Sequence, residues 1–145
     1  MKKYICVFFT LGCLLQIHAV KAQSVVGKWK TYDIFDKNRE EAIVEIYLDK
    51  GGLYVKIIDI LPLEHKNDLC KKCPGSLKDK PILGMIILRA AKFQDNLWQG
   101  AKILNAKNGK EYGCHISIEA PDLLRIRGFI GYPIFGKTLY WTRVE

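Results

Sequence analysis

The chain has 145 residues and a formal net charge of +8, with 49% hydrophobic and 26% charged residues. This length is sufficient for one domain whose hydrophobic core is stable without disulfides or bound metal ions. The positive charge is dispersed, because residues such as Lys28, Lys30 and Arg125 alternate with apolar neighbours as on the wet face of a sheet. We therefore expect no nucleic-acid partner; a weak attraction to anionic surfaces is the alternative.

The first 22 residues have the pattern of a secretory signal peptide. Two lysines precede an apolar run over 4–15, and small residues lead to an expected cleavage site after Ala22. The exported domain would then be 23–145, in the periplasm or secreted, with a formal charge of +5 because the leader removes three lysines and no acid. The apolar run is too short for a stable membrane span. A lipoprotein signal at Cys13 is a rival interpretation that the neighbouring residues disfavour.

Beyond the leader, the pattern predicts short strands separated by turns and no helix. Residues 82–88 are apolar on both faces, and we interpret them as a buried strand because the run is short, β-rich and contains Gly84. Eight antiparallel strands favour an all-β, up-and-down barrel without exposed edges, whose interior is filled by side chains or holds one small ligand. The expected strands are Val25–Ile34, Ala42–Leu48, Leu53–Leu61, Ile82–Leu88, Leu97–Leu104, Glu111–Ile118, Leu123–Phe129 and Lys137–Val144.

The two ends of this strand series carry a matching pair of motifs. Gly27-Lys28-Trp29 lies near the start and Trp141-Thr142-Arg143 near the finish. These resemble the glycine-x-tryptophan first strand and the late arginine of lipocalin-like barrels. The resemblance implies that the first and last strands pair and that Arg143 covers the ring of Trp29, a cation–π contact of about 0.5–2 kcal/mol.

A set of segments spread over the chain is similar to one bacterial family. The segments are Val26–Trp29, Ile43–Tyr47, Leu69–Gly75, Lys80–Gly84, Asn108–Tyr112, Arg127–Gly131 and Trp141–Val144. In this order they resemble the family called domain of unknown function 2147. The resemblance implies an exported protein with a lipocalin-like barrel and no established activity, so it adds no catalytic residues.

Reactive side chains are concentrated in the long polar segment 62–81, which contains Cys70-Lys71-Lys72-Cys73. Three cysteines follow the leader, and thiols tend to pair in an oxidising compartment. We favour a Cys70–Cys73 disulfide, because strand periodicity places Cys114 inside the barrel wall as a small apolar residue. A bridge to Cys114 is the alternative, since it closes more than 40 residues and stabilises by about 4 kcal/mol, against about 2 kcal/mol for the short loop.

Thiol or metal chemistry at this segment is a further hypothesis. The two intervening lysines would favour a thiolate, but the βαβ context of redox motifs is missing. His65, the cysteine pair and His115 or Cys114 outline a zinc site, yet structural zinc sites use two ligand pairs and only one is present here. We predict no catalytic residue, no metal and no cofactor. The sequence favours a role other than catalysis and leaves enzymatic activity undecided.

The many aromatic residues bear on how the barrel interior is used. They either fill a small barrel or line a cavity. The leading hypothesis is a binding protein for a small apolar or amphipathic ligand, and the first alternative is a structural or interaction protein of the cell envelope with a filled barrel. Oligomeric state is not predicted. The candidate cavity residues are Trp29, Tyr47, Trp98, Tyr112, Ile116, Phe129 and Trp141.

Overall fold

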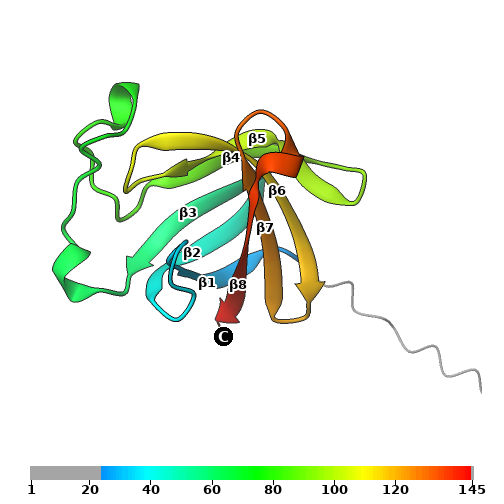
Figure 1. The fold of residues 1–145 in the computed structure, drawn as a ribbon, viewed down its shortest axis with the longest axis horizontal. Coiled ribbons are helices and arrows are strands. Elements are labelled where there is room, and N and C mark those ends of the chain that lie inside the picture. Colours follow the sequence, from blue (N-terminus) through cyan, green and yellow to red (C-terminus); the bar gives the residue numbers. More distant parts are fainter. Residues whose placement is uncertain (1–23, 145) are drawn as a thin grey trace, which may run out of the picture.

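The computed structural model describes residues 24–144, so the predicted signal peptide, residues 1–22, lies outside the described part. Within it, eight strands form one closed antiparallel barrel in which each strand pairs with the next and β8 returns to β1 (Figure 1). This confirms the predicted all-β, up-and-down barrel. The strands are β1 (Gly27–Tyr32), β2 (Glu40–Asp49), β3 (Gly52–Ile60), β4 (Ile86–Gln94), β5 (Leu97–Asn105), β6 (Lys110–Ala120), β7 (Leu123–Phe129) and β8 (Lys137–Val144).

The prediction of a strand over 82–88 is wrong in its bounds, because β4 begins at Ile86. Gly84 has a φ of +85°, which turns the chain out of strand geometry. The segment nevertheless bonds to β3, since the Ile57 amide donates to the Met85 carbonyl at 2.9 Å. Ile82 packs against both hydrophobic clusters of the protein. The apolar run therefore covers a turn in which Ile82 is half-buried and Leu83 is exposed, followed by the start of a strand, and hydrophobic patterning does not separate the two.

The two ends of the barrel are connected differently. At one end, two-residue turns at 50–51, 95–96 and 121–122 join successive strands. At the other end, the connections are longer and the β3–β4 connection extends well away from the barrel (green in Figure 1). We call the first the closed end and the second the mouth. The mouth connections are 33–39, 61–85, 106–109 and 130–136.

The most deeply buried part of the hydrophobic core lies at the closed end, where inward side chains next to the tight turns pack together. Leu53, beside the β2–β3 turn, and Leu124, beside the β6–β7 turn, are both fully buried. Trp29 is also fully buried, and its indole N–H donates to the Val25 carbonyl at 2.8 Å, so the buried polar atom is satisfied. This leaves room inside the barrel only towards the mouth.

The barrel is closed by pairing between β1 and β8, in which Trp29 stands opposite Arg143. The Arg143 guanidinium lies 4.2 Å from the centroid of the Trp29 ring. It also donates to the carbonyl oxygens of Ser24 at 2.8 Å and Pro121 at 3.1 Å, which ties the N-terminal segment to the β6–β7 turn. Gly27 has a φ of +138°, which favours glycine two positions before the tryptophan, and a Cβ there would also lie 2.9 Å from Arg143 Nη1.

Candidate functional site

A cavity of about 850 Å³ opens at the mouth of the barrel. Its deeper walls are apolar, because the inward positions of several strands contribute aliphatic side chains and two aromatic rings. The residues of these deeper walls are Val44, Ile57, Ile87, Ile103, Tyr112, Ile126, Leu139 and Trp141. The barrel is thus packed at its closed end and hollow at the other.

Gly128 on β7 enlarges this cavity. It pairs with Cys114 on β6, whose side chain is buried, so the missing side chain of Gly128 also belongs to the inner face. A Cβ built at Gly128 would meet no heavy atom within 4 Å. The wall therefore has free space at this position, in contact with the rest of the cavity.

Four charged side chains form a cluster at the rim. Asp33 and Arg39 come from the β1–β2 loop, Glu41 from the start of β2 and Lys107 from the β5–β6 turn. Arg39 pairs with Asp33 and lies 3.9 Å from Glu41, whereas Lys107 pairs with Glu41 and lies 3.5 Å from Asp33. Each cation therefore bridges both carboxylates, and the cluster joins three segments across the rim.

The two carboxylates of this rim cluster have different proton affinities. The backbone N–H of Phe35 donates to Asp33 Oδ1 at 2.8 Å and, with a hydrogen bond from Arg39, holds the pKa of Asp33 well below its usual range. Burial of the carboxylate acts in the opposite direction and is outweighed. Burial raises the pKa of Glu41, and the hydrogen bond from Lys107 opposes this rise. Asp33 is therefore the fixed negative charge of the rim, and Glu41 is the carboxylate that takes up a proton more readily.

The long β3–β4 connection is fastened by a Cys70–Cys73 disulfide. The two cysteines form a second, smaller hydrophobic cluster with Met85 and Leu104. Cys114 is a free, buried cysteine of the described chain, and burial raises the pKa of its thiol to about 12. A thiol in this environment stays protonated at neutral pH and is a poor nucleophile.

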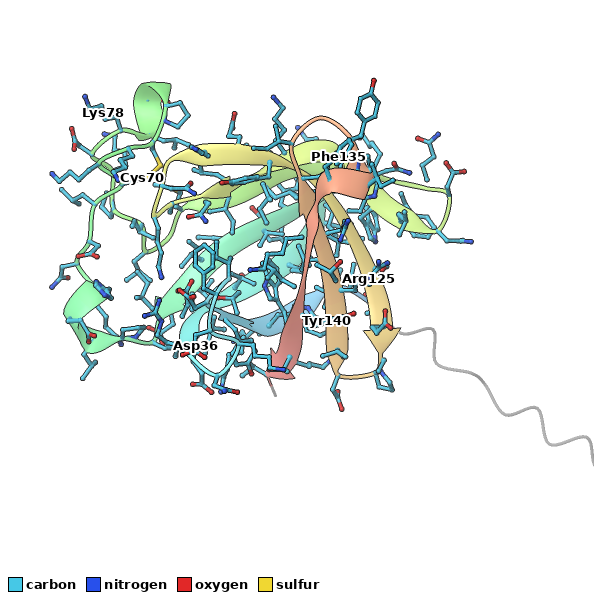
Figure 2. The ribbon with its side chains drawn as sticks, in the orientation of Figure 1. Asp36, Cys70, Lys78, Arg125, Phe135 and Tyr140 are labelled. Carbon is cyan, nitrogen blue, oxygen red and sulfur yellow. A yellow bond between two sulfur atoms is a disulfide. The ribbon has the colours of Figure 1, made fainter. Side chains whose placement is uncertain are left out.

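The disulfide loop is docked against the β5–β6 turn. Cys70 Sγ lies 3.1 Å from the Ala106 carbonyl oxygen, and Figure 2 shows Cys70 where the loop passes the end of the β5–β6 hairpin. Gly109 has a φ of +72°, and a Cβ there would come within 1.8 Å of the Lys72 carbonyl oxygen. This close approach brings Leu69 and Lys72 to the wall of the cavity, so the loop forms one side of the mouth.

The residues that could outline a zinc site do not converge. His65 Nδ1 lies 2.9 Å from Asp68 Oδ2, and Cys70 and Cys73 are consumed by their disulfide. Among residues 24–144, no three His, Cys, Asp or Glu side chains gather into a group suited to a metal ion. In the same part of the chain no helix is long and apolar enough to cross a membrane.

Two of the seven predicted cavity residues, Tyr112 and Trp141, line the cavity. Trp29 and Ile116 lie in the packed core of the closed end. The remaining three pack against neighbouring aromatic rings away from the cavity. These three contacts are Tyr47 with Tyr54, Trp98 with Phe93 and Phe129 with His115.

These features define the class of protein as a lipocalin-like barrel. The chain belongs to the family described as "Uncharacterized protein conserved in bacteria (DUF2147)", which matches residues 27–143. A solved structure, "Protein HP1028 from the human pathogen Helicobacter pylori belongs to the lipocalin family", is similar with a TM-score of 0.72 and 21% identity, covering 84% of each chain. At this identity the similarity shows a shared fold. A comparison with curated proteins found no match.

Replacing Gly109 by alanine tests the docking of the disulfide loop. Gly51→Ala is the matched control, because Gly51 has a similar φ of +77° but no neighbour within 4 Å. Both variants should lose about 1–2 kcal/mol from left-handed backbone strain. Only Gly109→Ala should also increase hydrogen exchange over 66–80, because its methyl group displaces the Lys72 carbonyl. Equal exchange in the two variants would contradict the docking.

Asp33→Asn tests the rim cluster. Because the folded pKa of Asp33 is depressed, its ionised form stabilises the fold above the ordinary aspartate pKa of 3.8, and this stabilisation is lost as pH falls below that value. The variant should lose about 1–2 kcal/mol near neutral pH, and the loss should shrink in acid, as measured by urea unfolding. Asp36→Asn, in the same loop, should be nearly neutral. Equal, pH-independent losses in both variants would refute this account.

Proposed function

We propose that this protein binds a small amphipathic molecule, with the apolar part of the ligand inside the barrel and its polar group at the mouth. The observation that supports this proposal is the open cavity of about 850 Å³, apolar in its depth and charged at its rim. Ligand sites are typically concave, mostly apolar spaces of roughly 300–1,000 Å³ with a few polar groups that fix orientation. The lipocalin-family neighbour supports it at the level of fold.

The interior favours an apolar moiety because it offers few polar partners. The Tyr112 hydroxyl accepts a hydrogen bond from the Asn108 side chain at 3.0 Å, so it is already engaged at the rim. Ile87, Ile103 and Leu139 offer only carbon atoms. Burying apolar surface against such walls contributes about 25 cal/mol per Å².

The rim favours a negatively charged headgroup. Five cationic residues contribute to the cavity walls, against three carboxylates and the fourth carboxylate, Asp33, of the adjoining rim cluster. Lys72 and Lys137 form no ion pair with any described residue, whereas Arg39 and Lys107 are held in the rim cluster. Lys137 instead donates to the Ile34 carbonyl and lies 4.8 Å from the centroid of the Phe35 ring. A carboxylate, sulfonate or phosphate on the ligand would therefore find unneutralised ammonium groups at the mouth.

Export of the mature domain 23–145 to the periplasm or beyond is part of this proposal. The leader pattern supports it, and the Cys70–Cys73 disulfide is of the kind that persists in oxidising compartments. Native mass spectrometry of the protein purified from its own cells should show a mass lacking residues 1–22, together with any ligand that it retains. A full-length mass would contradict cleavage.

Filling the cavity at Gly128 tests ligand binding. Gly128→Leu places four carbon atoms in the free space at this position, whereas Gly128→Ala adds one and serves as the graded control. With 1-anilinonaphthalene-8-sulfonate as an amphipathic anionic probe, we expect Gly128→Leu to weaken binding about tenfold and Gly128→Ala to change it little. Circular dichroism should show an intact barrel in both. Unchanged affinity in a folded Gly128→Leu variant would place the probe elsewhere and contradict the proposal.

A further inference from the structure

The β7–β8 loop, residues 130–136, exposes an unusual amount of apolar surface. It contains no charged residue, and four of its seven residues carry large apolar or aromatic side chains that are 68–79% exposed. These are Ile130, Tyr132, Ile134 and Phe135. Single exposed apolar residues are ordinary on protein surfaces, but a group confined to one short loop marks a contact surface.

This loop is held in place on the barrel wall. Arg127 on β7 donates from Nε to the Pro133 carbonyl at 3.0 Å and from Nη2 to the Ile134 carbonyl at 3.2 Å. A Cβ at Gly136 would lie 2.4 Å from the Gly128 carbonyl oxygen, so the end of the loop lies directly against β7. The exposed side chains are therefore presented by an ordered backbone, which lowers the entropic cost of using them in binding.

A basic groove lies directly beside the loop, on the outer face of the barrel. Ile134 and Pro133 form one side of it, and side chains of β6 and β7 form the other. Arg125 lies in this groove without an ion pair to any described residue, next to the potential hydrogen-bond donors His115 and Ser117. The groove contains no carboxylate. Figure 2 shows Arg125 on β7, the strand that leads up to the turn carrying Phe135.

We propose that the β7–β8 loop and this groove form a docking surface for a membrane that contains anionic phospholipid. The apolar side chains would enter the boundary between headgroups and acyl chains, and a headgroup phosphate would occupy the groove at Arg125. The surface combines an uncharged apolar tip with an adjacent unneutralised cation, which matches the two parts of a phospholipid. Tyr132 and Phe135 are residue types suited to that boundary. This proposal is independent of ligand binding inside the barrel.

Co-sedimentation of the purified protein with lipid vesicles tests this proposal. We expect binding to vesicles of mixed phosphatidylglycerol and phosphatidylcholine that exceeds binding to phosphatidylcholine alone. The double variant Ile134→Ser/Phe135→Ser should reduce partitioning at least about tenfold, because each apolar side chain contributes through its burial. Arg125→Gln should remove most of the preference for the anionic vesicles. Phe93→Ser is the matched control, because Phe93 is also exposed but lies next to the β4–β5 turn at the closed end.

Three outcomes would overturn the proposal. Equal partitioning of the wild type and the double serine variant, both shown to be folded by thermal unfolding, would exclude the loop as the contact. Binding of inorganic phosphate in the groove without any vesicle binding would assign the site to a free anion. Self-association that the double serine variant abolishes, in the absence of vesicle binding, would assign the loop to contact with a second copy of the chain.

Discussion

The pairing of β1 with β8, with Arg143 lying over Trp29, is the constraint on which the rest of the barrel depends. It joins the first and last strands of the described chain and closes the sheet, so that none of the eight strands is an edge strand. A cation–π contact of this kind contributes about 0.5–2 kcal/mol, and the hydrogen bonds from Arg143 add to it. Trp29 belongs to the buried core at the closed end, whereas the cavity opens at the mouth.

The mouth is assembled from segments that are far apart in the sequence, and ionic and covalent contacts hold them together. The rim cluster connects the β1–β2 loop to the β5–β6 turn, and the disulfide loop rests on that same turn through Gly109. Lys137, directly after the β7–β8 loop, reaches the β1–β2 loop. Lys137 and Ile34 both line the cavity, so their contact places the cavity next to the β7–β8 loop. A ligand in the cavity and a membrane at the loop would therefore contact neighbouring parts of the chain.

Local patterning was sufficient to predict the architecture, and long-range geometry accounts for what it missed. Alternation and turn residues predict eight strands, but the apolar turn at Ile82–Gly84 has the same pattern as a strand. Trp29 and Ile116 face inward as expected but lie in the packed core, because alternation gives the face of a strand that a side chain occupies and not its height along the barrel. Tyr47 directly follows the fully buried Ile46 and therefore lies on the opposite face of its strand. The rim cluster carries no sequence signal beyond the turn-forming spacing of Asp33, because its members meet only when the barrel closes.

Cys114 has a consequence for how the chain reaches this structure. In the folded barrel its thiol is sealed in the core and inert, but in the unfolded chain it is as accessible as Cys70 and Cys73. Three pairings then compete, and a bridge to Cys114 would tie the inside of the wall to the mouth loop. Only burial of β6 protects the thiol. The yield of native protein in an oxidising medium therefore depends on two rates. The core must form around Cys114 faster than its thiol is oxidised.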